Sequence, residues 1–159
     1  MGAVVPCTPD DLHKLSPLLA KFRAALKAYK GIIAVENTEA AHEEAQEFFA
    51  AGFPIFAYEE KGAFVGYIVC RQDGAWWVEQ LYVLPTHRGR GAAEALYAAA
   101  EKLAAPDTLY NWVHPNNDGM IRFLAKRGYD TLNLIEIRKK YEGEEPRERI
   151  AVGNNVFNY

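Results

Sequence analysis

One stretch of the chain constrains the fold more than any other: an apolar run, a short turn with two glycines and two arginines, and an alanine-rich segment follow one another over residues 79–97. A strand, a glycine turn and a helix in this order are typical of an anion site, because the first N–H groups of a helix have no intrahelical acceptor and its dipole is positive at that end. Gly89 and Gly91 let the main chain approach a ligand closely, although glycine in such a turn can also serve torsional freedom alone. The pattern predicts a phosphate site.

Two other phosphate-binding loops are excluded by the residues of the turn. The P-loop of nucleotide hydrolases needs a Gly-Lys-Ser or Gly-Lys-Thr step, which does not follow Gly91. The third glycine of a Rossmann loop would fall at Glu94, whose side chain would obstruct the packing of the helix on the sheet. A Rossmann or flavodoxin-like binder is disfavoured further, because three strands in succession precede the turn.

The composition indicates one domain that binds neither nucleic acid nor an anionic membrane. A length of 159 residues with 50% hydrophobic residues suffices for a single core, and the formal net charge is −3. The N-terminus shows no basic segment followed by an apolar core, and no apolar run approaches ~18 residues, so we expect a cytoplasmic protein without a membrane span. Cys7 and Cys70 lie far apart and are expected to be reduced, inert thiols.

Turn signals and hydrophobic periodicities predict a mixed α/β chain. Strands are expected over residues 3–7, 54–59, 63–71, 75–84, 109–114 and 131–141, and helices over residues 9–26, 38–51, 92–105 and 117–127. The strands from Pro54 to Leu84 form an antiparallel meander, and the strand–helix–strand step that follows is parallel, which places the glycine turn at the carboxyl end of a strand. Residues 142–159 form a tail, expected as an edge strand or hairpin that extends this sheet or a partner's.

The residues around the turn are similar to those of a known family. They read Arg88-x-x-Gly91-x-Ala93, preceded by Leu81-x-Val83-x-Pro85. This pattern resembles the acetyl-CoA loop of the GCN5-related N-acetyltransferases (GNAT), whose element order β-α-α-β-β-β-α-β-α-β matches the predicted order. The resemblance implies a mixed, mostly antiparallel sheet of six to seven strands with about four helices, splayed at strands four and five, with residues 1–141 as a single acetyltransferase domain.

The resemblance also implies an activity: acetyl-CoA-dependent transfer of an acetyl group to a primary amine, directly within a ternary complex and without a metal. The turn would bind the diphosphate, and the strand before it would bind the pantetheine amides. An amide at Val83 or a neighbour would stabilise the oxyanion, an effect often worth ~3 kcal/mol. The side chains of the two arginines would add charge attraction or lie in a solvated rim. Coenzyme contacts are expected from Leu81, Tyr82, Val83, Arg88, Gly89, Arg90, Gly91, Ala92, Ala93, Asn117 and Phe123.

The catalytic groups match the family only in part. The segment from Asn117 to Gly128 fits the family's Asn-x-x-(small)-x-x-x-Tyr-x-x-x-Gly pattern, except that Leu124 replaces the tyrosine that protonates the departing thiolate. Leucine donates no proton, so water or another group must serve, or the step needs little help. Glu79 is the candidate base, because an ammonium with a pKa of ~10.4 must lose its proton before it attacks. The alternative is a surface carboxylate paired across strands.

Several alternatives stay open at this point. His87 and His114 lie within reach of the site, but each is expected to be a local hydrogen-bonding residue. The missing tyrosine is compatible with a non-catalytic acyl-CoA-binding regulatory module, which is the second functional hypothesis. The acceptor is a small-molecule amine or a peptide amine such as a protein N-terminus, and exposed sheet edges favour a homodimer.

Overall fold

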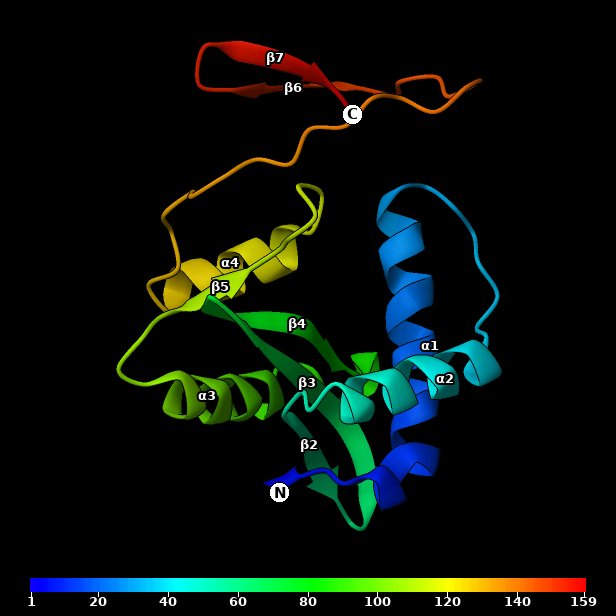
Figure 1. Cartoon of the computed structure of the whole chain (residues 1–159), viewed down its shortest axis with the longest axis vertical. Coiled ribbons are helices and arrows are strands. Elements are labelled where there is room, and N and C mark those ends of the chain that lie inside the picture. Colours follow the sequence, from blue (N-terminus) through cyan, green and yellow to red (C-terminus); the bar gives the residue numbers. More distant parts are fainter. The chain divides into compact units, whose positions relative to one another are not determined.

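The computed structural model describes residues 1–159, which form two compact units, Met1–Phe123 and Leu124–Tyr159 (Figure 1). We call them the body and the C-terminal unit. None of the helices combines the length and the apolar character that crossing a membrane requires.

A five-stranded sheet forms the centre of the body. Its strands are β1 (Ala3–Pro6), β2 (Ile55–Glu60), β3 (Ala63–Asp73), β4 (Ala75–Val83) and β5 (Leu109–Asn111), in the order β1-β2-β3-β4-β5. All neighbours are antiparallel except β4 and β5, which are parallel. The mixed, mostly antiparallel sheet predicted from the sequence is therefore confirmed, although β5 ends three residues earlier than expected.

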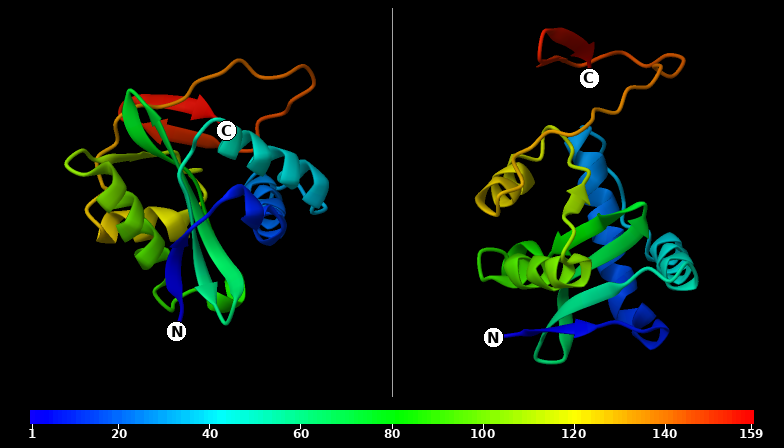
Figure 2. Two further views of the ribbon diagram at one scale, coloured as in Figure 1. Left: turned by 60° about the horizontal axis from the view of Figure 1, so that its bottom comes forward. Right: turned by 60° about the vertical axis from the view of Figure 1, so that its left-hand side comes forward.

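Helices cover both faces of this sheet. α1 (Leu12–Tyr29) and α2 (Thr38–Ala50) lie on one face and α3 (Ala92–Ala104) lies on the other (Figures 1 and 2). The side chain of Asn37 accepts a hydrogen bond from the Ala40 amide at 3.0 Å, so Asn37 is the N-cap of α2, one residue before the expected Thr38. α1 continues through Pro17 without a break.

Gly66 of β3 fixes the close packing of α3 on the sheet. A Cβ at this position would lie 2.9 Å from the Tyr82 carbonyl oxygen and 3.4 Å from the Leu96 side chain of α3. Because only glycine fits there, α3 lies close to the end of β4. The N-terminus of α3 is thereby placed next to the strand that carries the predicted pantetheine contacts.

The C-terminal unit holds a hairpin of its own. β6 (Arg149–Val152) and β7 (Asn155–Asn158) pair antiparallel around Gly153, whose φ is +59°, as the turn residues predict. Upstream of it, Arg138 forms a bidentate ion pair with Glu144, which also accepts a hydrogen bond from the Tyr141 amide. These contacts lower the pKa of Glu144 to about 2.

The strand predicted over residues 131–141 is not formed, which corrects the expected element order. α4 (Asp118–Lys126) is followed by Gly128, whose φ is +89°, and residues 131–141 are in no helix or strand. Period-two alternation shows only that a segment can be a strand, because its N–H and C=O groups still need a neighbouring strand as partner. In this chain the main sheet ends at β5.

Candidate active site

The site begins with an irregularity in β4. β4 pairs with β3 along its whole length, but the register skips one residue: Val69 pairs with Gln80 and Cys70 pairs with Val78. Glu79 is therefore the extra residue of a β-bulge. A bulge bends its strand and increases the local twist, which directs the strand away from a neighbour.

The parallel pairing of β4 with β5 stops at this bulge. The two strands pair at only three positions, of which the last joins Val78 to Asn111. Beyond it β4 continues to Val83 without a partner on that side. The splay between strands four and five, expected from the family resemblance, is present and begins at Glu79.

The main chain of β4 beyond the bulge offers its polar groups to this gap. The Leu84 amide donates to the Val65 carbonyl at 2.9 Å, which defines Leu84 and Val65 as a hydrogen-bonded antiparallel pair. Hydrogen-bonded and non-hydrogen-bonded pairs alternate along an antiparallel ladder. In the observed register, Leu81 and Val83 are therefore the residues whose N–H and C=O groups point away from β3, toward the open side of β4.

The glycine turn continues directly from this open strand. A short 3-10 turn, Pro85–His87, leads to Gly89 and Gly91, whose φ angles are +71° and +84°. The amide groups of residues 89–93 make no hydrogen bond to a backbone carbonyl, and the first intrahelical bond of α3 runs from the Ala95 amide to the Gly91 carbonyl at 3.0 Å. Five consecutive amides without an internal acceptor at a helix N-terminus fit a diphosphate.

The two arginines of the turn have different roles. Arg88 Nε donates to the Val83 carbonyl at 2.9 Å, and its guanidinium lies 5.5 Å from the centre of the Tyr82 ring. Arg88 therefore ties the turn to the end of β4. The side chain of Arg90 is exposed.

A small cleft, which we call the β4–β5 cleft, opens at the splay and encloses about 80 Å³. Its lining comprises Val78, Glu79, Gln80 and Leu81 of β4, Asn111, Trp112, Val113, His114, Asn117 and Met120 on the β5 side, and Phe22 and Leu26 of α1. The structure thus brings together the candidate base, Leu81 and Asn117, as the sequence predicted. Val83 and the glycine turn follow on the same strand.

Glu79 is paired across strands, which was the alternative to its role as a base, and its partner is Arg71 of β3. Its Oε2 atom lies 3.1 Å from Nε of Arg71 on β3, but the angle is not that of a hydrogen bond, so both buried atoms lack a hydrogen-bond partner. Arg71 also contacts the Asp73 carboxylate at 3.1 Å. The ion pair with Arg71 holds the Glu79 carboxylate at the wall of the cleft.

Aromatic rings extend this cluster along β4 and β5. Trp77 stacks on Trp112 with 4.3 Å between ring centres and contacts Tyr110 at 5.1 Å. The Arg71 guanidinium lies 5.3 Å from the Trp112 ring, which is 56% exposed. Trp112 is therefore an exposed aromatic residue on the cleft wall.

The residues of the second family motif hold α4 in place. Asn117 is the N-cap of α4, because its Oδ1 accepts from the Met120 amide at 3.1 Å, and Phe123 contacts the Tyr97 ring edge-on at 5.6 Å. Leu124, at the position of the family's tyrosine, is buried. The two histidines make local contacts: His114 stacks on Tyr29, and His87 lies 3.7 Å from Glu60.

A polar network lies under the other face of β4 and was not found from the sequence. The Tyr67 hydroxyl donates to Gln80 Oε1 at 2.7 Å, and Gln80 Nε2 donates to Glu44 Oε1 at 3.0 Å. Glu44 in turn forms a bidentate ion pair with Arg23. Burial raises the pKa of Tyr67 well above its usual value, so the phenol keeps its proton and donates.

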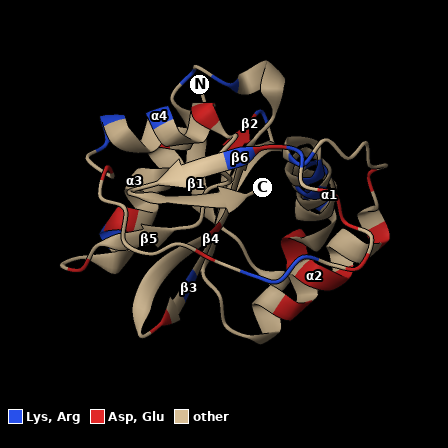
Figure 3. Cartoon of the chain, turned by 90° about the horizontal axis from the view of Figure 1, so that it is seen from above, with Lys and Arg blue, Asp and Glu red and all other residues tan.

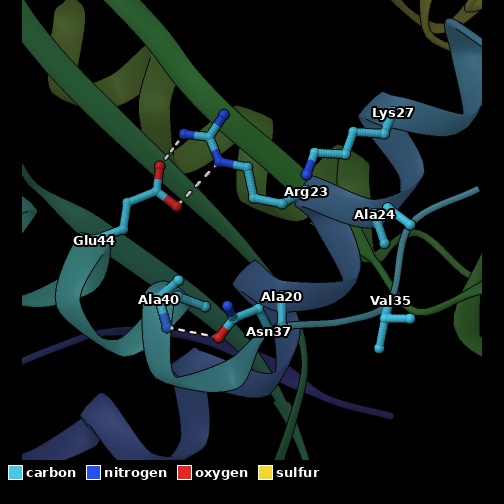
Figure 4. Close-up of a pocket in the computed structure, with 10 residues that line it drawn as sticks. Ala20, Arg23, Ala24, Lys27, Val35, Asn37, Ala40 and Glu44 are labelled. Atoms are coloured by element: carbon cyan, nitrogen blue, oxygen red, sulfur yellow. Dashed lines mark hydrogen bonds and ion pairs between the residues drawn. The ribbon is translucent and has the colours of Figure 1, made fainter. Parts of the chain in front are cut away.

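This network reaches the surface between the first two helices. Arg23, Glu44, Lys27 and Asn37 line a pocket of about 290 Å³ (Figure 4). Acidic residues gather along α2 and basic ones along α1, and Lys21–Glu36 is a second ion pair at this place (Figure 3). Arg23 and Glu44 neutralise each other, so Lys27 is the charged residue of this lining that has no ion-pair partner.

Comparisons with known proteins agree with this geometry. The model of the acetyltransferase (GNAT) family matches residues 19–129. An aminoglycoside N-acetyltransferase, AAC(6')-Iy in complex with CoA, superposes with a TM-score of 0.71 at 16% identity over 88% of this chain and 95% of its own. The ribosomal-protein-alanine N-acetyltransferase of Brucella melitensis gives 0.65 at 19% identity over 89% and 99%.

A third solved structure is the PaiA N-acetyltransferase of Thermoplasma acidophilum in complex with coenzyme A, with a TM-score of 0.66 at 16% identity over 80% of this chain and 88% of that chain. At these identities the likeness concerns the fold. The search of the curated proteins gave no match.

A splayed parallel strand pair beside an open glycine turn defines an acyltransferase that uses a coenzyme A thioester. With the family model matching most of the body, the chain belongs to the GNAT acetyltransferase family. It is an acetyl-CoA-dependent N-acetyltransferase.

Proposed function

We propose that the β4–β5 cleft is the place where the acetyl group passes directly from acetyl-CoA to a small primary amine. The observation that carries this proposal is the direction of the main chain beyond the bulge, because the amides of Leu81 and Val83 point to the cleft. The amides of residues 89–93 in the adjoining turn have no internal acceptors. A thioester could therefore lie along β4 with its diphosphate at the turn. The oxyanion would form beside a preorganised N–H group.

In the proposed step, the amine nitrogen bonds to the acetyl carbon and the C–S bond breaks, giving an amide and the CoA thiolate. The proton of the ammonium goes to the Glu79 carboxylate, which lines the cleft at the bulge, directly or through a water molecule. The thiolate takes its proton from water, since Leu124 has none to give. Positioning and oxyanion stabilisation supply most of the rate enhancement.

The acceptor is proposed to be a small-molecule amine. The cleft encloses only about 80 Å³, and its walls include the Glu79 carboxylate and the exposed Trp112 ring, two groups that attract a cation and that Arg71 contacts from β3. Release of CoA thiol from acetyl-CoA over a panel of amines, which includes polyamines, aminoglycosides and N-terminal peptides, tests this proposal. Faster release with small polycations than with peptides is expected.

The second candidate function is a non-catalytic acyl-CoA-binding module, because the buried Leu124 stands where the family has its proton-donating tyrosine. The same panel separates the two, because a binding module would hold CoA tightly and release no thiol in response to any amine. The cytoplasmic location and the homodimer expected from the sequence stay predictions.

A further inference from the structure

The two groups of the β4–β5 cleft that attract a cation already share one from the protein itself. The guanidinium of Arg71 contacts the Glu79 carboxylate at 3.1 Å and lies 5.3 Å from the centre of the Trp112 ring. Both Glu79 and Trp112 line the cleft. A side chain of β3 therefore takes the same partners that an acceptor ammonium would use.

The contact between Arg71 and Glu79 is an ion pair without a hydrogen bond. Arg71 Nε and Glu79 Oε2 are both buried, and neither atom has a hydrogen-bond partner. Buried polar atoms of this kind are rare, and the strong ion pairs are those that also form charge-assisted hydrogen bonds. We therefore expect a cation that donates a well-directed hydrogen bond to Glu79 to displace the guanidinium.

A second carboxylate gives Arg71 another position. Its Nη1 atom donates to Asp73 Oδ2 at 3.1 Å, and the Asp73 side chain is 72% exposed at the end of β3. One guanidinium thus serves two carboxylates, so Arg71, Asp73 and Glu79 together carry one negative charge in excess. When an ammonium pairs with Glu79, Arg71 keeps Asp73 as its partner, and each of these charges is matched.

We propose that Arg71 selects the acceptor: its guanidinium is a resident cation that the acceptor ammonium displaces from Glu79 and Trp112. This inference rests on the proposed function, because it concerns the amine side of the same cleft. Alkylamines, with a pKa of about 10.4 as in lysine, arrive charged and compete with the guanidinium. Weakly basic amines are uncharged at neutral pH and do not compete, so Arg71 excludes them. Once Arg71 has withdrawn to Asp73, Glu79 is free to take the proton of the ammonium.

Tryptophan fluorescence of the full-length protein tests the displacement without acetyl-CoA and hence without turnover. Ethylammonium chloride is the charged probe, and trifluoroethylamine, uncharged at neutral pH, is its matched comparison. We expect a saturable change in fluorescence with ethylammonium alone, because the guanidinium then leaves the exposed Trp112 ring. An equal change with both amines, or no change with either, overturns the proposal.

Removal of the resident cation supplies the second test. Arg71→Gln is expected to lower the dissociation constant of ethylammonium about fivefold, because no ion pair has to be broken first. Lys102→Gln is the control, since it removes the same charge at an exposed position of α3, and it leaves the dissociation constant unchanged. Circular dichroism checks folding, and Arg71→Met repeats the test if Arg71→Gln does not fold. An unchanged or higher dissociation constant in the Arg71 variant overturns the proposal, because Arg71 would then only hold Glu79 in place.

Steady-state kinetics separate this inference from the proposed function. In Arg71→Gln the KM for ethylamine is expected to fall in the same proportion as the dissociation constant. If ethylammonium displaces Arg71 but no amine is acetylated, the proposed function fails and the displacement stands. If ethylamine is acetylated and its KM does not fall in Arg71→Gln, the proposed function stands and the displacement is refuted.

Discussion

The two edges of β4 differ from position 79 onward: the edge facing β3 is paired within the sheet, and the edge facing β5 is open. Along the β3 edge the ladder continues past the bulge to Val83, but along the β5 edge it stops at Val78. The main-chain groups of Gln80 and Tyr82 face the closed edge, and their side chains are buried under α1 and α2. Leu81 and Val83 instead turn their main chain to the open edge. An extra residue at position 79 is enough to free a row of amides without unfolding the sheet.

The largest effect is expected when a backbone amide is removed from one edge of β4 only, because this separates the functions of the two edges. Val83→Pro deletes an N–H group that points to the cleft and takes no part in the ladder with β3, so we expect kcat to fall about 10²–10³-fold. Because the Val83 side chain is buried, some stability is lost as well, but less than when a ladder bond is also removed. Steady-state kinetics with acetyl-CoA and a thermal unfolding curve measure the two effects. Tyr82→Pro is the matched control, because it removes a ladder bond and should lower the melting temperature. Equal loss of activity and stability in both variants would contradict the division.

The next largest effect is expected at the bulge residue. Glu79→Gln keeps the shape but removes the proton acceptor, so kcat/KM should fall about 10²-fold. Asp73→Asn is the control, since it alters the other carboxylate that contacts Arg71. Rates measured from acid to alkaline pH decide the matter: an identical pH profile in wild type and Glu79→Gln removes Glu79 from the mechanism.

The closed edge should respond in stability and not in rate. Tyr67→Phe leaves Gln80 Oε1 without its buried donor, and we expect a loss of about 1–3 kcal/mol in the free energy of unfolding. Urea denaturation measures this loss. A fall in kcat of more than about twofold, beyond what partial unfolding explains, would show that the network under α1 and α2 also serves catalysis.

The smallest effect concerns the arginines of the turn. Arg88→Gln loses the bond to the Val83 carbonyl, and the KM for acetyl-CoA should rise about fivefold, equivalent to about 1 kcal/mol. Arg90→Gln removes only an exposed charge, so a change below about twofold is expected. Comparable effects of the two variants would mean that charge, and not the tether, matters at this turn.

Local patterns in the sequence were sufficient for most of the body. The glycine turn, the meander and the parallel step were predicted because each depends on neighbouring residues, and Glu79, Leu81 and Asn117 indeed line one cleft. Burial also raises the pKa of the Cys70 thiol to about 12, which agrees with an inert cysteine in a core strand. The sequence allowed Glu79 to be paired across strands but did not identify Arg71 as the partner, because local spacing does not show which side chains meet across strands.

Two outcomes show where local patterns end. The bulge could have been suspected from a glutamate inside an otherwise apolar strand, but the register that defines it depends on β3. Residues 131–141 have a strand pattern without forming a strand, since pairing needs a neighbouring edge that a periodicity does not supply. An alternating pattern shows that a segment can form a strand, and the presence of a neighbouring strand decides whether it does.

The bond from Arg88 to the Val83 carbonyl has a consequence for donor choice. It joins the place that would hold the diphosphate to the place that would hold the thioester, so the spacing between them is set by one side chain. This spacing would select a donor of matching length. Thioesters whose pantetheine part is one methylene longer, or which lack the nucleotide, would place their carbonyl away from the amide that stabilises the oxyanion.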